Sequence, residues 1–204
     1  MIYLMMNKPR GVVTTASDEK GRETVFDVMK KAERQVPAEM EGSPMWIAPV
    51  GRLDKASEGL LLLTNDSEWG ARVAAPETHL NKTYHVQIAA LADDELLRAL
   101  VRGVEVAEGK EKERLCARRV SVLRSGEKNC WLEIALDEGK NRQIRRMLAA
   151  FGIEVLRLVR VAIGPLMLGD LAKGECRALT AEEKLSLDRA MQSRVGKART
   201  GAHG

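Results

Sequence analysis

GRLDKASEGLLLLTN, the sequence of residues 51–65, contains four consecutive leucines between Gly59 and Asn65. A short continuous apolar run bounded by turn residues predicts a strand that is buried on both faces. The polar residues before it are therefore expected on a loop at the mouth of a core strand, where a substrate can reach Asp54. Loops on rigid scaffolds commonly carry the chemistry of a site. On spacing alone, a surface pair of Arg52 and Asp54 beside a core strand is the commoner explanation.

A second acid, Glu58, follows Asp54 in the same loop and raises the alternative of a paired acid and base or of a metal site. Lys55 lies between the two acids, and Glu58 immediately precedes the buried strand, so we interpret Glu58 as a solvated loop acid. The three histidines form no metal-ligand pattern. Asp54 remains the candidate catalytic carboxylate.

Secondary structure is predicted from the period of apolar residues. Alternation and short apolar runs predict strands at about 2–6, 11–15, 47–50, 83–88, 115–123, 130–136 and 154–163. Helical spacing predicts helices at about 24–32, 67–73 (with Ser67 as N-cap), 93–100, 141–151 and 181–191. Residues 33–46 are expected to form an exposed loop, 108–114 a charged hairpin tip and 124–129 a hairpin turn. Strands outnumber helices and several neighbours are hairpins, so the fold class is α+β with a mixed, mostly antiparallel sheet.

Composition is typical of an ordinary globular protein, with 204 residues and 45% hydrophobic content. Residues 1–191 are expected to form one domain of two lobes that share one sheet, and residues 192–204 a disordered basic tail. No apolar run approaches the roughly 20 residues that span a membrane, and the N-terminus lacks the basic start of a signal peptide. The three cysteines, far apart in sequence, are expected to be reduced thiols of a cytoplasmic protein.

Positive charge is concentrated in one segment, although the net charge of +4 is mild. Residues 140–160 contain a single acid, Glu154, and six cations: Lys140, Arg142, Arg145, Arg146, Arg157 and Arg160. A charge run usually marks a solvated helix face, but this excess of cations favours a phosphate-rich partner.

The predicted helix at 141–151 separates its arginines by angle. Its expected buried stripe has i, i+3, i+4, i+7 spacing and consists of Ile144, Met147, Leu148 and Phe151. Arg145 lies at the edge of that stripe and can reach inward to a carboxylate, whereas Arg142 and Arg146 project from the opposite side toward phosphates. The alternative for Arg145 is a side chain whose stem covers apolar surface while its charge stays in water.

Several motifs occur together, and in this order they resemble the RsuA family of ribosomal RNA pseudouridine synthases. They are Asn7-Lys8-Pro9, Gly51-Arg52-Leu53-Asp54, Lys82-Thr83-Tyr84, the segment EGKNRQIRRM at 138–147 and LVRVAIGPL at 158–166. The resemblance covers about residues 2–180. It implies a pseudouridine synthase fold, a bent mixed sheet with flanking helices and a central cleft. Many family members carry an additional N-terminal RNA-binding domain, which we expect to be absent because the catalytic-type sequence begins at Ile2.

The resemblance also implies roles for single residues. Asp54 is the catalytic residue of the family's motif, and Arg145 occupies the position of its active-site arginine. Tyr84 matches the tyrosine on which the flipped base stacks, although a core tyrosine is the commoner explanation of its pattern alone. Arg52 is implied to hold the flipped nucleotide or its phosphate. Further RNA contacts are expected from the neighbouring cations Lys140, Arg142, Arg146 and Arg160.

The predicted function is isomerisation of a specific uridine to pseudouridine in structured RNA, most plausibly large-subunit ribosomal RNA. Asp54 either attacks the anomeric carbon or removes the proton at C2′, and both routes need an ionised carboxylate near the sugar. We expect no metal and no cofactor, no membrane partner, and a monomer. A non-catalytic ribosome assembly factor on the same fold, or an enzyme acting on transfer RNA, are the alternatives. A metal-dependent nuclease would need more convergent acids than this chain shows.

Overall fold

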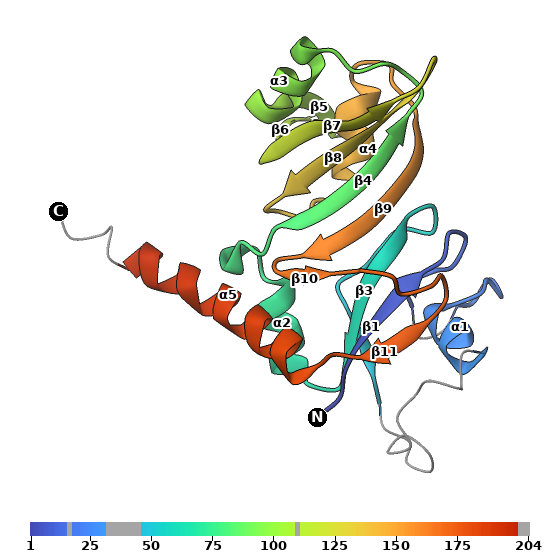
Figure 1. Ribbon diagram of the computed structural model, residues 1–204, viewed down its shortest axis with the longest axis vertical. Coiled ribbons are helices and arrows are strands. Elements are labelled where there is room, and N and C mark those ends of the chain that lie inside the picture. The colour runs from blue at the N-terminus through green and yellow to red at the C-terminus, as the bar shows by residue number, and fades with distance from the viewer. Residues whose placement is uncertain (16–17, 32–45, 109–110, 200–204) are drawn as a thin grey trace. The chain divides into compact units, whose positions relative to one another are not determined.

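The computed structural model describes residues 1–15, 18–31, 46–108 and 111–199. The chain divides into two compact units, one of residues 1–80 with 161–204 and one of residues 81–160. Figure 1 labels the helices and strands of both units. No helix within the described ranges is long and apolar enough to cross a membrane.

The first unit is built on β3 (Glu58–Thr64), in which every residue is buried. This confirms the predicted strand buried on both faces. β1 (Tyr3–Lys8) pairs with β3 from Tyr3 opposite Thr64 to Lys8 opposite Gly59, and β2 (Ala48–Val50) pairs with the C-terminal half of β3. β11 (Cys176–Ala178) extends the sheet beyond β1. These pairings are all antiparallel, as predicted.

Helices α1 (Val25–Lys31), α2 (Ser67–Ala74) and α5 (Ala181–Arg199) and the 3-10 turn η2 (Pro76–Thr78) belong to the first unit. The N-cap of α2 is Asp66 and not Ser67, because Asp66 Oδ1 accepts a hydrogen bond from the backbone N–H of Trp69 at 2.9 Å. α5 is tied to α2 by the Trp69 indole, whose Nε1 donates to Asp188 at 2.9 Å. α5 continues to Arg199, beyond the end that helical spacing predicted for it.

The strand predicted at 11–15 is wrong. This segment has only an isolated bridge between Val13 and Thr24, because Gly11 takes a φ of 94° and turns the chain away from β1. Most of the predicted loop at 33–46 lies outside the described residues.

The second unit contains a sheet in the order β9-β4-β8-β7. Its strands are β4 (Lys82–Ile88), β7 (Arg119–Ser125), β8 (Cys130–Leu136) and the first residues of β9 (Val155–Ile163), whose last residues pair with β10 (Leu166–Met167) in the first unit. The predicted hairpin turn is closed by Gly126 N–H donating to Asn129 O at 2.8 Å. The single strand predicted at 115–123 is instead split. Its start belongs to β6 (Glu111–Leu115), which pairs with β5 (Val104–Glu108) in a separate two-stranded sheet.

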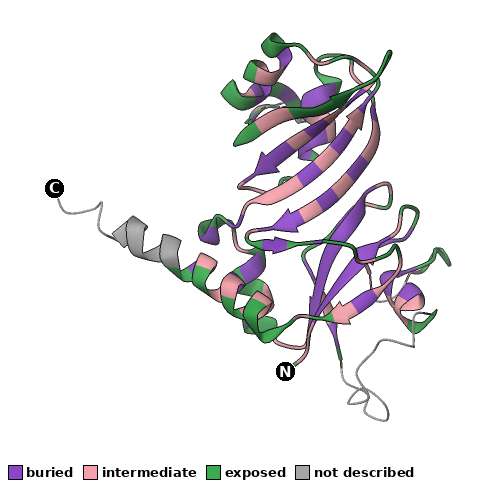
Figure 2. Ribbon diagram, viewed as in Figure 1, coloured by how far each residue is buried: buried purple, intermediate pink, exposed green. Residues whose placement is uncertain are grey.

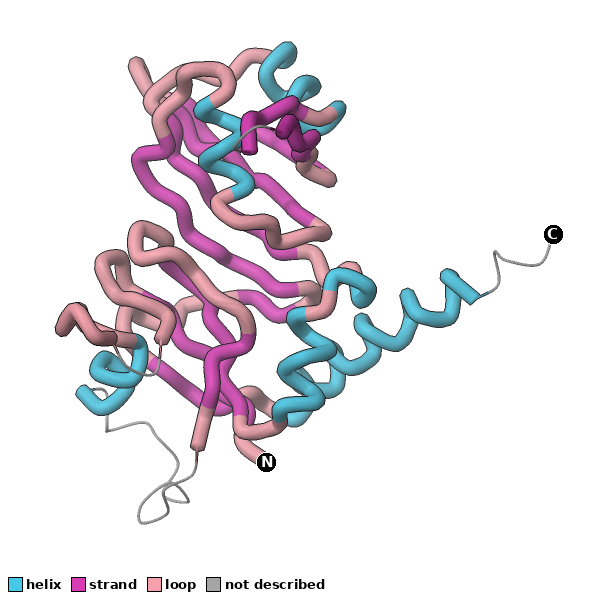
Figure 3. The backbone as a smooth tube through the Cα atoms, turned by 180° about the vertical axis from the view of Figure 1, so that it is seen from behind, coloured by secondary structure: helices cyan, strands magenta, loops and turns pink. Residues whose placement is uncertain are grey.

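The two faces of this second sheet differ in burial. Buried and half-buried residues alternate along β4, as Figure 2 shows. α4 (Gln143–Ala149) lies behind the sheet in Figure 1 and in front of it in Figure 3, so it covers one face, while α3 (Asp94–Arg102) packs near β7. Because successive side chains of a strand point to opposite faces, the buried side chains of β4 lie on one face of the sheet and the half-buried ones on the other. Helices and antiparallel strands in both units confirm the α+β fold class.

Candidate active site

The loop that carries Asp54 is fixed through its backbone. After β2, Gly51 turns the chain with a φ of 67°, a conformation that favours glycine. Thr14 Oγ1 then donates to the carbonyl of Leu53 at 2.8 Å and accepts its N–H at 3.3 Å. A turn from Asp54 to Ser57 is closed by Ser57 N–H donating to Asp54 O at 2.9 Å. The loop is therefore a defined structure and not a flexible connection.

Lys8 is the centre of this arrangement. Its side chain is 0% exposed at the end of β1, a burial that lysine tolerates only with partners. Its ammonium donates to the carbonyls of Pro9 at 3.0 Å, Asp54 at 3.3 Å and Ser57 at 2.8 Å. Lys8 thereby ties the Asp54 turn to β1. In the sequence, Lys8 stands out only as part of the Asn7-Lys8-Pro9 motif, and nothing there predicts this role.

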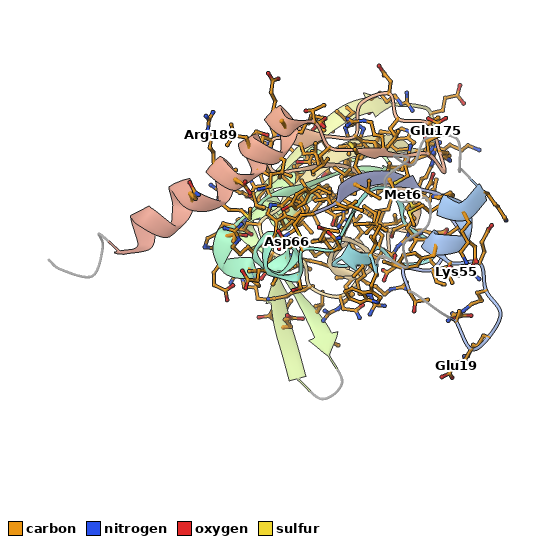
Figure 4. All side chains as sticks on the ribbon, turned by 90° about the horizontal axis from the view of Figure 1, so that it is seen from below. Met6, Glu19, Lys55, Asp66, Glu175 and Arg189 are labelled. Carbon is orange, nitrogen blue, oxygen red and sulfur yellow. The ribbon has the colours of Figure 1, made fainter. Side chains whose placement is uncertain are left out.

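Within its own unit, Asp54 is positioned by hydrogen bonds to its backbone and not by bonds to its carboxylate. Asp54 is half-buried, and among the described residues of the first unit its carboxylate has no hydrogen-bond or ion-pair partner. Arg52, two residues earlier, is exposed. Figure 4 labels Lys55 in this loop and Asp66 at the start of α2, which lie at opposite ends of β3. Asp54 is thus an acid whose backbone is fixed, while its carboxylate takes no part in the bonds that hold the loop.

The prediction that Glu58 is a solvated loop acid is wrong. It is 2% exposed, is the first residue of β3, and pairs with Lys173 Nζ at 2.7 Å. The alternation rule gives no warning here, because both faces of β3 are buried. Glu58 is therefore a paired structural acid and not a second open carboxylate beside Asp54.

Tyr84 belongs to the second unit, on the buried face of β4. It is 8% exposed and shares this face with Val86 and Ile88, which are both 0% exposed. Lys82, the first residue of β4, is two positions before Tyr84 and lies on the same face of the strand. Burial, and after it the positive charge of Arg160, lower the pKa of Lys82, while Asp137 acts in the opposite direction.

The loop before α4 is held by side chains. Gln143, 2% exposed, donates through Nε2 to the carbonyl of Cys116 at 3.0 Å and to Glu138 at 3.2 Å, and its Oε1 accepts the N–H of Lys140 at 3.2 Å. These bonds fasten residues 138–140 to the start of α4. Gln143 was not predicted as a site residue, since a polar residue in a basic segment gives no sign of burial.

The predicted phosphate contacts occupy different environments. Arg146 pairs with Glu113 at 2.8 Å and its side chain is only 22% exposed, so it does not project into open solvent as the helical angles predicted. Lys140 pairs with the same Glu113 at 3.1 Å and with Glu138 at 3.2 Å. Arg160 is buried, at 5% exposure. These cations are engaged within the protein.

Arg142 differs from them. It is exposed, and within the described part of the chain it forms no ion pair. Arg142 is also the N-cap of α4. Its φ is 47°, a value that residues other than glycine rarely adopt. A non-glycine residue held in this region is a candidate for function.

Arg145 is half-buried on α4, as predicted for the edge of the apolar stripe, and its Nη1 donates to the carbonyl of Val155 at 3.2 Å. Ile144, Met147 and Leu148 form the buried stripe. Phe151 does not belong to it and is 44% exposed, because α4 ends at Ala149 and the helical period stops there.

The predicted residues are thus divided between the units. Asp54 and Arg52 lie in the first, and Tyr84, Lys140, Arg142, Arg145, Arg146 and Arg160 lie in the second. Among the described residues, no group of three or more His, Cys, Asp or Glu side chains is arranged to hold a metal ion.

Comparison with known proteins identifies the family. A model of the RNA pseudouridylate synthase family matches residues 2–150. The chain is 37% identical over 182 residues to ribosomal large subunit pseudouridine synthase B of Bacillus subtilis, a match that covers 89% of this chain and 69% of that protein. It is 38% identical over 162 residues to the protein of the same name from Yersinia pestis, covering 79% of this chain and 46% of that one.

Solved structures agree with these matches. A crystal structure of a pseudouridylate synthase is 30% identical, with a TM-score of 0.72, over 91% of this chain and 73% of that one. A chain of an H/ACA ribonucleoprotein bound to a substrate RNA is 15% identical, with a TM-score of 0.55, over 81% of this chain and 48% of that one, and this supports the fold alone. The expected pseudouridine synthase fold is confirmed. The chain belongs to the RNA pseudouridylate synthase family and is RsuA-like, as its motifs predicted.

Proposed function

We propose that this protein converts a uridine to pseudouridine in structured RNA, and that this RNA is large-subunit ribosomal RNA. The observation that carries the proposal is the Asp54 loop, whose backbone is fixed by Lys8 and Thr14 while its carboxylate stays half-exposed. Relatives named for the large ribosomal subunit support the class of RNA. Free thiols at all three cysteines are consistent with action in the reducing cytoplasm.

The reaction exchanges one bond to the sugar for another. The bond between C1′ and N1 of the base breaks, the base turns, and C1′ bonds to C5, which loses its proton while N1 gains one. No electrons enter and no group leaves, so the balance needs neither a redox cofactor nor ATP. Asp54 serves either by attacking C1′ or by removing the C2′ proton, and both routes require a carboxylate held near the sugar.

The other roles follow the family's motifs. Tyr84 is proposed as the surface on which the flipped base stacks, because an aromatic ring accepts any base. Arg145 is proposed as the active-site arginine, because it occupies the position of that residue in the family's motif. Arg52 and Arg142, both exposed, are proposed to bind phosphates of the substrate.

The test is to map pseudouridine in total RNA from cells with and without this protein. We expect a position in large-subunit ribosomal RNA to lose its pseudouridine, and expression of the wild-type chain to restore it. A lost position in transfer RNA would show that the class of RNA is wrong. Loss of no position would overturn the enzymatic proposal and favour the assembly factor.

A further inference from the structure

Trp131 is flanked by two arginines on the uncovered face of the second sheet. The guanidinium carbon of Arg124 lies 5.1 Å from the centroid of the indole ring, and that of Arg157 lies 5.8 Å from it. In the strand order β9-β4-β8-β7, Arg157 on β9 and Arg124 on β7 approach Trp131 from its two sides. Cations at these distances from an indole ring are attracted by its π-electrons, so the ring holds both planes in place.

An irregularity in β7 puts Arg124 there. Val122 is the partner of Leu132 and Arg124 is the partner of Trp131, so Leu123 is an extra residue between them. With regular pairing, Leu123 would oppose Trp131 and Arg124 would point to the other face. Bulges of this kind redirect a side chain. Here the bulge places a guanidinium on the aromatic ring.

This face carries an excess of positive charge. Among the described residues of β8 and β7, it contains Arg119 and Arg124 against one carboxylate, Glu133. Glu133 is already engaged, by Arg119 at 2.7 Å and by His85 at 3.6 Å. The charge of Arg124 is therefore left for a partner of negative charge.

Strand alternation separates this surface from the proposed base platform. Trp131 is the partner of Gln87 in β8 and β4, whereas Tyr84 is the partner of Ile134. Positions of odd and even number point to opposite faces, so Trp131 and Tyr84 lie on the two sides of one sheet. The Trp131 surface, defined as Trp131, Arg124 and Arg157, is not part of the site described above.

We propose that the Trp131 surface binds an unpaired strand of RNA, with Arg124 contacting a phosphate and Trp131 contacting a base. An arginine plane fixed over an aromatic ring, like that of Arg124, keeps its outer N–H donors for phosphate oxygens, and both the plane and the ring can stack on bases. These contacts need no particular base sequence. The proposal rests on RNA being the substrate, and it gives this RNA a second contact on the face of the sheet opposite Tyr84.

The experiment measures binding of a fluorescent single-stranded RNA of about twelve adenosine and cytidine nucleotides, a length in the range of known single-strand sites. This RNA contains no uridine, so its binding is independent of isomerisation. Arg124→Gln should weaken binding several-fold and lower the slope of log affinity against log salt by about 0.7, the value for one lost contact to a single strand. Binding should also change the tryptophan fluorescence of the wild type, and Trp131→Phe should remove that change.

The matched control is Arg98→Gln, which removes the same charge from α3 in the same unit. Arg98 is exposed and pairs only weakly, at 3.4 Å, with Asp94, so its loss should leave the salt slope unchanged. Equal effects of Arg124→Gln and Arg98→Gln would overturn the proposal and reduce it to general charge attraction. Unchanged RNA affinity in Arg124→Gln would also overturn it. Loss of isomerisation alone, with these results intact, would bear only on the proposed function.

Discussion

The Asp54 loop and the loop that leads into α4 are stabilised in opposite ways. In the first, the buried ammonium of Lys8 binds backbone carbonyls, and the carboxylate of Asp54 takes no part in these bonds. In the second, side chains of the basic segment form the bonds: Gln143 binds Glu138 and two backbone groups, and Lys140 and Arg146 both pair with Glu113. A loop fixed through its backbone can leave its side chain to the substrate. A cluster of like charges must instead be neutralised by nearby acids, which leaves fewer cations for RNA.

Asp54→Asn should separate function from stability most completely. Because the Asp54 carboxylate supports no bond within its own unit, its loss should leave the thermal unfolding midpoint near that of the wild type. Product formation should fall at least about a hundredfold, or about 2.7 kcal/mol of barrier. Single-turnover formation of pseudouridine in RNA measures the chemical step. Activity within about tenfold of the wild type would refute the assignment.

Lys8→Met should instead reduce stability and activity together. The methionine keeps the apolar stem of the side chain but leaves the carbonyls of Pro9, Asp54 and Ser57 without this donor. Each buried acceptor left unsatisfied costs about 1–3 kcal/mol. We expect a fall of this size in the free energy of unfolding in urea, and a lower chemical rate because the Asp54 turn is no longer tied to β1.

Lys55→Met is the control for Lys8→Met, because Lys55 is an exposed lysine of the same loop. It should change neither quantity. If the two substitutions have the same effect on stability, Lys8 does not hold the loop.

Substitutions of the cations around the second loop should have different effects, depending on whether the cation has an acidic partner. Arg142→Gln removes an exposed charge that has no ion pair in the described part of the chain, so it should lower the salt slope of RNA binding by about 0.7–0.9 without loss of stability. Arg146→Gln should lower the free energy of unfolding by about 1 kcal/mol, because it breaks a half-buried pair with Glu113. Urea unfolding and RNA titration at several salt concentrations distinguish these effects. If both variants change the free energy of unfolding and the salt slope equally, the pair with Glu113 does not decide what these arginines do.

Sequence patterns predicted what depends on periodicity and missed what depends on burial of charge. The leucines of β3 and the alternation around Tyr84 in β4 are strong signals, because many apolar residues repeat at the period of a strand. The angular position of Arg145 followed from the same kind of rule. The identity of Asp54 as a candidate came from its motif, since spacing alone favoured a surface pair.

Lys8 and Glu58 could not be found in this way. Both are charged residues whose burial depends on partners distant in sequence, such as Lys173 for Glu58. The bulge at Leu123 is equally invisible, because one extra residue in a strand changes no composition. Phe151 was misplaced because the periodic pattern runs past the point where α4 ends.

The smallest effect is expected at the end of β3 away from the Asp54 loop. Tyr3 donates its hydroxyl proton to Asp66 at 2.7 Å, and Asp66 caps α2 through Trp69. Burial, and after it the hydrogen bond to Asp66, raise the pKa of Tyr3 from 10.0 to about 12. Since the folded pKa exceeds the unfolded one, this contribution is fully present below about pH 10 and is lost as the pH rises toward 12.

Tyr3→Phe isolates that contribution, because it removes the titrating hydroxyl and keeps the ring. This ring packs edge-on against Trp69, with the two ring centroids 4.9 Å apart. At neutral pH the variant should lose only about 1 kcal/mol of unfolding free energy, the usual value of one hydrogen bond, and it should form pseudouridine at the wild-type rate. Urea unfolding of both proteins from about pH 9 to pH 12 provides the measurement, since the other titrating groups cancel in the difference. The difference in stability should shrink across this interval as the wild type loses its advantage.

A difference that stays constant would mean that Tyr3 ionises as easily in the folded chain as in the unfolded one. A loss of activity in Tyr3→Phe would instead show that the two ends of β3 are coupled, and that the Asp54 loop depends on more than its own backbone bonds.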